Sequence, residues 1–134
     1  MTIDSCVIID LPKVVDQRGN LTFIESGRHV SFEFKRIFYL YDIPGEADRG
    51  GHALKRCHQF VVAMSGSFDV VVGDGRDERR VQLDRPNRGL YIPPMIWRSL
   101  DNFSSCAVCM VVASENYDED DYFRSYDDYL RASR

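Results

Sequence analysis

The sequence predicts a single all-β domain, a barrel or sandwich in which short strands follow one another along the chain. A chain of 134 residues has room for one hydrophobic core. Short runs of apolar, β-branched and aromatic residues alternate with turn residues, and their spacing does not suit alternating strands and helices. Strands are expected at residues 6–9, 21–25, 34–42, 52–54, 59–64, 67–72, 79–83, 90–92, 97–100 and 107–113.

Turn residues define the boundaries of these strands. Asp74 and Gly75 supply the positive φ angles that a tight reversal needs, so residues 68–83 are expected to form a hairpin. Gly66 marks the preceding turn, and the Pro93-Pro94 pair should end or bend a strand.

The last segment has a different pattern. Its aromatic and apolar residues recur at helical spacing, its acidic residues 118–121 suit a helix start, and Arg131 suits a helix end. The sequence therefore predicts one domain over residues 1–134, with a β-barrel over 1–115 and a C-terminal helix over 116–132.

Composition narrows the class of protein and its surroundings. The net charge of −4 argues against a protein built to coat nucleic acid, and no apolar run approaches the length of a bilayer span. The first residues lack the features of a signal peptide, so we expect a cytoplasmic protein with no membrane or nucleic-acid partner. Cys106 and Cys109 lie three apart in a predicted strand, where they face opposite sides and cannot share a metal or a disulfide.

Two separated segments specify the fold more closely. His52, Leu54, Gln59 and Gly66 follow the spacing of the first cupin motif, which is H-x-H, four residues, Glu, six residues, Gly. Pro93, Met95, Arg98 and Asn102 follow the second motif, P-x-G-x-x-H-x-x-x-N, and the Asp74-Gly75 hairpin lies between the two. The chain thus resembles the cupins, and the resemblance implies a double-stranded β-helix, or jelly-roll barrel.

The residues at the four cupin ligand positions do not suit a metal ion. Those positions hold His52, Leu54, Gln59 and Arg98, where a cupin metal site has three histidines and a carboxylate. A guanidinium keeps its proton and repels a cation, so we expect no metal and no other cofactor. The set suits anion binding and proton transfer instead, with His52 as general base and Arg98 as a phosphate or oxyanion contact. The alternative for His52 is a hydrogen-bonded strand histidine.

With these residues in place, the chain resembles the nucleotide-sugar 3,4-ketoisomerases. That family acts on dTDP-4-keto-6-deoxyglucose and makes the 3-keto isomer for deoxyamino-sugar pathways, such as those of lipopolysaccharide O-antigens. The likeness covers nearly the whole chain and is carried by residues 16–21, 35–42, 49–53, 89–91, 97–98, 101–105, 117–119 and 121–122.

The resemblance implies a mechanism without a metal. A base removes the proton from C3, next to the C4 ketone, and the resulting enediol is reprotonated at C4. The resemblance also implies a homodimer, often with an N-terminal strand exchanged between subunits, and a pocket that grips the thymidine diphosphate.

One departure from the family concerns Leu54. Many members carry a second histidine there and use both for proton transfer, whereas this chain reads His52-Ala53-Leu54-Lys55. Either one histidine suffices, helped by water, substrate or a tyrosine such as Tyr39, or the activity is altered or lost.

Further candidate contacts lie in the shared segments. Arg18, Arg36 and Arg49 are candidate diphosphate contacts or surface salt bridges, and Tyr91 and Trp97 either stack on the ligand or belong to the core. Gln59 is expected to face the pocket and bind a sugar hydroxyl. The competing functions are a cupin that binds a dTDP-sugar without turnover and an isomerase or epimerase with altered substrate; a metal-dependent cupin is disfavoured.

Overall fold

The computed structural model describes residues 2–133 and consists mostly of short strands. The prediction of an all-β fold with a short C-terminal helix is confirmed. The strands are β1 (Val7–Asp10), β2 (Lys13–Val14), β3 (Leu21–Thr22), β4 (Arg36–Leu40), β5 (Arg49–Leu54), β6 (Gln59–Ser65), β7 (Phe68–Gly73), β8 (Glu78–Leu83), β9 (Arg88–Ile92), β10 (Trp97–Asp101), β11 (Val108–Ala113) and β12 (Tyr122–Phe123). The helical elements are the 3₁₀ turns η1 (Ile3–Ser5) and η2 (Glu119–Asp121) and the helix α1 (Tyr126–Ser133).

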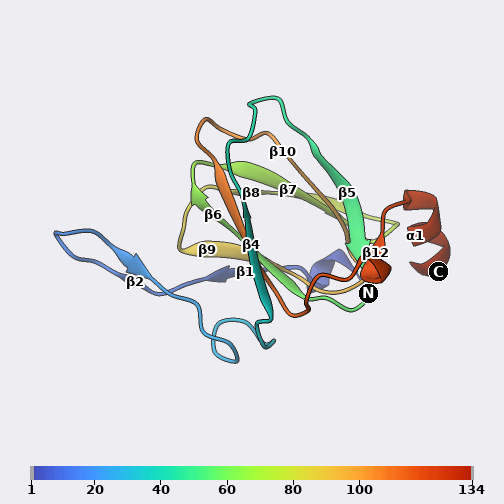
Figure 1. Ribbon diagram of the computed structural model, residues 1–134, viewed down its shortest axis with the longest axis horizontal. Helices are drawn as coiled ribbons and strands as arrows, with labels where there is room; N and C mark the ends of the chain where they lie inside the picture. Colours follow the sequence, from blue (N-terminus) through green and yellow to red (C-terminus); the bar gives the residue numbers. More distant parts are fainter. Residues whose placement is uncertain (1, 134) are drawn as a thin grey trace.

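Two five-stranded sheets face each other (Figure 1). One has the order β1-β9-β6-β11-β4 and the other β12-β5-β10-β7-β8, with antiparallel pairing within each. The described ladders do not join the two sheets into a closed ring of hydrogen bonds. Alternate residues of the strands point between the sheets, where the main core includes Val61, Phe68, Leu90 and Ile96.

The predicted hairpin around Asp74 and Gly75 is present as β7 and β8, paired from Phe68 with Leu83 to Gly73 with Glu78. Gly75 has a φ of +91° and Gly66 a φ of +66°, so both turns use the backbone freedom that only glycine has at low cost.

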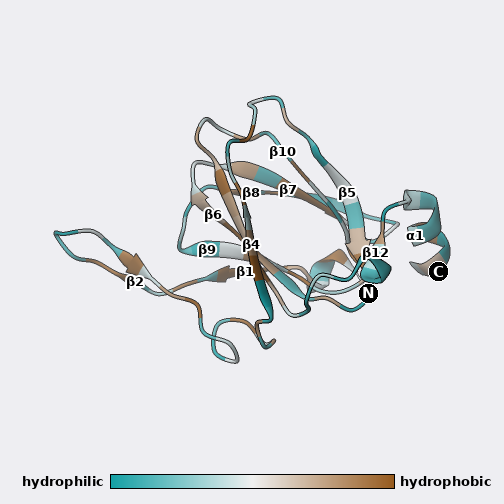
Figure 2. Ribbon diagram, in the orientation of Figure 1, coloured by the Kyte–Doolittle hydropathy of each residue, from teal (hydrophilic) through white to brown (hydrophobic). Residues whose placement is uncertain are grey.

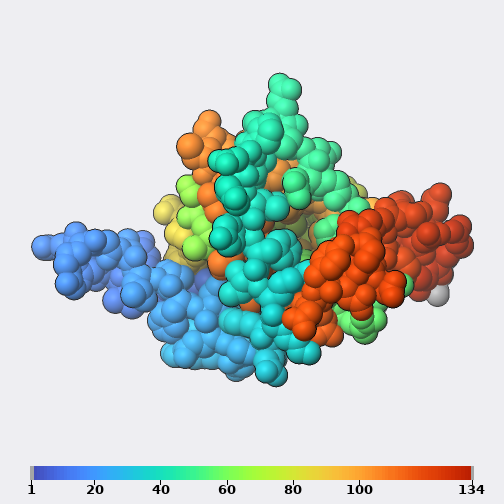
Figure 3. Space-filling model, viewed as in Figure 1, coloured from blue at the N-terminus to red at the C-terminus, as the bar shows by residue number. Residues whose placement is uncertain are grey.

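The N-terminal region is the part of the chain that stands away from the two sheets. Strands β2 and β3 form a separate hairpin that projects from one end of the molecule, opposite the C-terminal segment (Figures 1 and 3). Its side chains Val14, Val15 and Leu21 are between half and three-quarters exposed. Figure 2 shows the apolar colouring of β2 on this projecting hairpin.

The prediction of one helix over residues 116–132 is wrong. The segment instead forms a 3₁₀ turn, a two-residue strand and a helix restricted to Tyr126–Ser133. Asp118 begins the 3₁₀ turn because its side chain accepts a hydrogen bond from the backbone N–H of Asp120. The helical spacing of the aromatic residues is coincidental up to Tyr122, because pairing of β12 with Leu54 and Ala53 of β5 outweighs local propensity.

All four cysteines are free, and Cys106 is exposed while Cys109 is buried. Cys106 lies before β11 in the left-handed region, with a φ of +58°, rather than in the strand.

Among residues 2–133, no helix is both long enough and apolar enough to cross a bilayer.

Candidate functional site

A cavity of about 510 Å³ opens between the two sheets. This volume lies in the usual range for small-molecule sites. Strands of both sheets and the C-terminal segment line it, with residues Phe38, Leu40, Asp48, Arg49, Gly50, His52, Gln59, Val61, Ile92, Arg98, Ser99, Leu100, Val111, Tyr122 and Arg124. Apolar and polar residues contribute to the walls in similar measure, and several charged groups converge on the interior.

His52 and Arg98 form the centre of this polar group. They are direct cross-strand partners, because β5 and β10 pair antiparallel with His52 opposite Arg98. Side chains at such a pair lie on one face, about 5 Å apart at their Cβ atoms. The two cupin-like segments, 46 residues apart in sequence, therefore meet at this pair of positions.

Gln59 joins the pair from the facing sheet. Its Oε1 accepts a 2.6 Å hydrogen bond from Nη1 of Arg98, while Nε and Nη2 of Arg98 donate to the backbone carbonyl of Ile96. Gln59 and Arg98 are both 3% exposed. The bond to Arg98 orients the Gln59 amide, and the buried Nε2 has no partner among the described residues. Gln59, a residue of the cavity wall, thus has a buried N–H donor without a partner within residues 2–133, beside a buried cation.

Electrostatics keep His52 neutral. Its pKa falls from 6.5 to about 3, chiefly because burial penalises the charged imidazolium and secondly because Arg98 and Arg124 are close. A backbone hydrogen bond at Gly50 and the Glu119 carboxylate oppose this shift without cancelling it. Burial also lowers the pKa of Arg98 to about 10, which still leaves the guanidinium charged at neutral pH. At pH 7 the site therefore pairs a proton acceptor with a cation.

The C-terminal segment contributes a wall that sequence reasoning missed. Tyr122 lies with its ring centroid 5.3 Å from that of His52, and the Arg124 guanidinium lies 4.3 Å from the centre of the Tyr122 ring. Residues 121–122 are among those that carry the resemblance noted in the sequence, but the helix predicted over 116–132 concealed their place in the cavity. The signal that points to a strand is the alternation of Tyr122 and Arg124 toward the same side.

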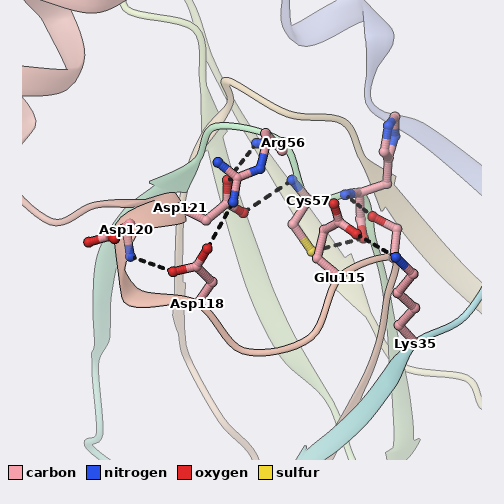
Figure 4. A network of polar contacts seen from close by, with 9 residues as sticks. Lys35, Arg56, Cys57, Glu115, Asp118, Asp120 and Asp121 are labelled. Atoms are coloured by element: carbon pink, nitrogen blue, oxygen red, sulfur yellow. Dashed lines mark hydrogen bonds and ion pairs between the residues drawn. The ribbon is translucent and has the colours of Figure 1, made fainter.

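A buried carboxylate holds that wall in place. Asp121 is 3% exposed and accepts hydrogen bonds from the backbone N–H groups of Arg56 and Cys57, at 2.8 and 3.2 Å. Its own carbonyl accepts from the N–H of Lys55. Figure 4 shows the contacts of Asp121 with Arg56 and Cys57, together with the ion pair from Arg56 to Asp118. These hydrogen bonds join the β5–β6 turn to the 3₁₀ turn η2, which immediately precedes Tyr122 in the chain.

Four of the predicted site residues line the cavity: Arg49, His52, Gln59 and Arg98. Arg36 lies at its margin on the same face of β4 as Phe38, where its guanidinium packs over the rings of Phe38 and Tyr117.

The other four lie elsewhere in the subunit. Tyr39 alternates with the cavity residues of β4 and is 62% exposed on the outer face. Tyr91 also faces outward, with its hydroxyl 2.7 Å from Nδ1 of His58. Trp97 packs against Tyr126 and Tyr129 of α1.

Arg18 lies in the turn of the β2–β3 hairpin. Its side chain is 90% exposed and pairs with Asp16. Arg18 is thus the one predicted ligand contact that lies on the projecting β2–β3 hairpin, away from the two sheets (Figure 1).

Leu54 is fully buried and does not line the cavity. It packs with Cys57, Ala113 and Tyr122. Leu54 is apolar where many family members have a histidine, as expected, but it does not face the cavity. The leucine packs against Tyr122 instead.

The donor set does not fit a metal ion. Within residues 2–133, no three His, Cys, Asp or Glu side chains gather to form a candidate metal site. Of the cupin ligand positions, one holds the buried Leu54 and another the Arg98 cation. A metal-independent reaction remains the prediction that this chemistry favours.

Comparison with known proteins identifies the family of the chain. The chain matches the family model described as FdtA, WxcM-like, C-terminal, over residues 4–134. It is 42% identical over 124 residues to the TDP-4-oxo-6-deoxy-alpha-D-glucose-3,4-oxoisomerase of Aneurinibacillus thermoaerophilus, a match covering 92% of this chain and 89% of that protein.

Similar solved structures are those of sugar 3,4-ketoisomerases. QdtA, a sugar 3,4-ketoisomerase from Thermoanaerobacterium thermosaccharolyticum solved with TDP, matches with a TM-score of 0.93 and 34% identity, over 96% of this chain and 93% of that one. The WlaRB TDP-quinovose 3,4-ketoisomerase of Campylobacter jejuni matches with a TM-score of 0.92 and 41% identity, over 96% and 99%. A histidine-to-asparagine variant of QdtA was solved with TDP-4-keto-6-deoxyglucose. The predicted cupin-type fold and the predicted family are confirmed.

Proposed function

The chain belongs to the FdtA family of sugar 3,4-ketoisomerases, and we propose that its own substrate is TDP-4-keto-6-deoxyglucose, with His52 as the base. The observation that supports this most directly is the direct pairing of His52 with Arg98 inside the cavity. A neutral imidazole beside a buried cation is the combination that proton removal next to a ketone requires.

In the proposed reaction, His52 removes the proton from C3 while the C4 oxygen becomes an enediolate. Arg98 and the free Nε2–H of Gln59 stabilise that oxygen, because both are buried donors already oriented before the reaction. Gln59 is thus a donor to the reacting oxygen rather than only to a sugar hydroxyl. Return of the proton to C4 gives the 3-keto isomer.

Binding of the substrate should change the pKa of His52. Arg98 and Arg124 both lower the pKa of His52, and Arg124 and Arg49 stand at the cavity wall. A diphosphate bound near Arg49, Arg124 and the marginal Arg36 brings negative charge that offsets this effect. Binding of the nucleotide should therefore raise the pKa of His52 toward the range in which a general base works best.

A homodimer completes the proposal. The hairpin exposes Val14, Val15 and Leu21, and Ile37 and Met64 are 55% and 46% exposed beside it. An apolar groove of about 590 Å³ runs between the hairpin and the outer face of the β1-β9-β6-β11-β4 sheet. Covering these side chains with a second copy removes them from water, and exchange of the hairpin brings Arg18 of one subunit to the other subunit's site.

The setting we propose is the cytoplasm and the synthesis of deoxyamino sugars for a surface polysaccharide such as an O-antigen. The four free thiols, three of them buried, suit a reducing compartment.

The test is proton NMR of the metal-stripped protein with TDP-4-keto-6-deoxyglucose in deuterated water. We expect a 3-keto product that carries deuterium at C4. Broadened ligand signals without any new sugar signal would contradict the reaction and favour a binding module, whereas turnover that appears only when metal is restored would contradict the metal-independent mechanism.

A further inference from the structure

Ketone migration needs two separate proton transfers, and His52 accounts for one. The hydrogen on C3 must reach C4, and the hydroxyl proton on O3 must reach O4. A single imidazole that holds the carbon-bound proton is not free to move the oxygen-bound one at the same time. A second group that both gives and takes a proton is therefore required, and this requirement rests on the proposed function above.

Few of the polar cavity residues qualify. The arginines keep their protons, and the Gln59 amide has none to exchange at neutral pH. Ser99 also lines the cavity, but its aliphatic hydroxyl is a much weaker acid than a phenol and gives up its proton less readily. Asp48 lies four positions before His52, roughly 13 Å along an extended chain. Tyr122 remains, and its phenol is a group that donates and accepts.

The geometry of Tyr122 supports this role. It pairs directly with Leu54 across the β5–β12 ladder, which makes it the diagonal neighbour of His52 on the same face. The two rings lie 5.3 Å apart at an interplanar angle of 42°. Within residues 2–133, no hydrogen bond engages the Tyr122 hydroxyl, which leaves it available to a ligand, and the ring lines the cavity.

The contacts around Tyr122 hold its ring in a constant position. The Arg124 guanidinium lies over the ring at 4.3 Å, and Glu119 holds it there through hydrogen bonds of 2.6 and 2.9 Å. The buried Asp121, which directly precedes Tyr122, accepts hydrogen bonds from the β5–β6 turn and so fixes the position of the Tyr122 ring beside His52.

This arrangement explains why position 54 holds a leucine. A second histidine at that position would place its own ring where Leu54 now packs against Tyr122. The second polar group on this face is therefore supplied from across the ladder instead of from the same strand, and the leucine supports its apolar edge.

We propose that Tyr122 is a catalytic residue that moves the proton between the two sugar oxygens while His52 moves the proton between the two carbons. His52 takes the C3 proton and the C3–H electron pair forms the C3=C4 bond. The Tyr122 hydroxyl gives its proton to O4 and its oxygen takes the proton from O3. The C4=O π electrons remain on O4, the electrons of the O3–H bond form the C3 carbonyl, and the C3=C4 π electrons bind C4 to the proton returned by the imidazolium. All electrons therefore stay within the enzyme and the substrate.

The experiment compares wild type, Tyr122→Phe and the control Tyr126→Phe with TDP-4-keto-6-deoxyglucose in deuterated water. Tyr126 is a tyrosine of the same C-terminal segment that packs on Trp97 outside the cavity. Two rates are followed by NMR: formation of the 3-keto product, and entry of deuterium at C3 of unconverted substrate. We expect Tyr122→Phe to lower kcat by a factor on the order of 10² with KM unchanged, and Tyr126→Phe to match wild type.

The ratio of the two rates separates catalysis from structure. Because His52 still removes the C3 proton in Tyr122→Phe, deuterium entry at C3 should persist and rise relative to product formation. Equal loss of both rates would indicate a structural role and overturn the proposal, as would wild-type turnover by Tyr122→Phe. If the wild-type protein itself formed no product, the proposed function would fail first, and the ratio would not be reached.

Discussion

The cavity between the sheets and the projecting N-terminal hairpin both carry residues from segments shared with the family, but they differ in completeness. Within one chain, the buried Gln59 and Arg98 are hydrogen-bonded to each other, and the partly buried His52 is the cross-strand partner of Arg98. The Arg18 side chain is 90% exposed, and within residues 2–133 its ion pair is with Asp16, two residues away. The difference teaches that residues on core strands can form a site within one subunit. A residue on a projecting hairpin can join a site only if the hairpin contacts another surface, such as that of a second subunit.

The largest effect is expected inside the cavity. His52→Asn should retain the fold and ligand binding but reduce turnover by a factor of about 10² to 10⁴, as loss of a general base does. Steady-state kinetics with the keto-sugar nucleotide measure the change, and calorimetric binding of TDP checks that affinity is kept. The matched control is His58→Asn, since His58 contacts Tyr91 outside the cavity. A wild-type rate for His52→Asn would exclude it as the base.

A smaller effect is expected from the hairpin. Arg18→Ala should weaken substrate binding by roughly 10- to 100-fold, the size of one lost charge-assisted hydrogen bond, with little change in kcat. The control is Arg28→Ala, an exposed arginine that pairs with Glu25 near the same region. KM and kcat are measured for both variants. An unchanged KM in Arg18→Ala would remove this residue from the site.

Mixing the two variants tests whether the hairpin serves the partner. If the site is shared, a heterodimer of His52→Asn and Arg18→Ala contains one intact site, so refolding the two together should restore about a quarter of wild-type activity. The activity is compared with that of each variant refolded alone. No gain on mixing, with Arg18→Ala still impaired, would place Arg18 at the site of its own chain.

Leu54 tests how strictly the back of the cavity wall is packed. Leu54→His should lower the free energy of unfolding by about 1 to 3 kcal/mol, because it buries a polar ring where the side chain has no exposure and only apolar neighbours. Urea denaturation measures the loss, with Leu54→Met as the volume-matched control. Higher turnover in Leu54→His would contradict the support role and indicate that this position can carry a proton-transfer group.

The smallest effect concerns pH. His52 has a pKa of about 3 in the folded protein and an ordinary value of 6.5 in an unfolded chain, so the unfolded chain binds its proton first as the pH falls. This group therefore destabilises the fold progressively from about pH 6.5 down toward pH 3 and is neutral in both states above that range. Between pH 7 and 5 the stability gap between wild type and His52→Asn should shift against wild type by up to about 2 kcal/mol. Denaturant midpoints at the two pH values measure it; a constant gap would mean an unshifted pKa.

Sequence reasoning anticipated most strands and the polar set of the cavity for a physical reason. Spacing within a strand determines which side chains share a face, and the two cupin-like segments provide strands β5, β6 and β10, which hold His52, Gln59 and Arg98. Sequence reasoning failed at the C-terminal segment because the aromatic residues there recur at a helical period. Their pairing partner lies about 70 residues earlier in β5, and local periodicity contains no information about it.

By itself, the sequence determined the fold class, the family, the hairpin turns and the residue types of the cavity, since these depend on alternation, turn chemistry and motif spacing. Only the tertiary structure decided which of those residues meet. It sent Tyr39 and Tyr91 to the outer face, put Trp97 under the C-terminal helix, and brought Tyr122 beside His52. The reason is that such contacts arise from pairing between strands distant in sequence and from buried anchors such as Asp121, whose partners no local pattern can identify.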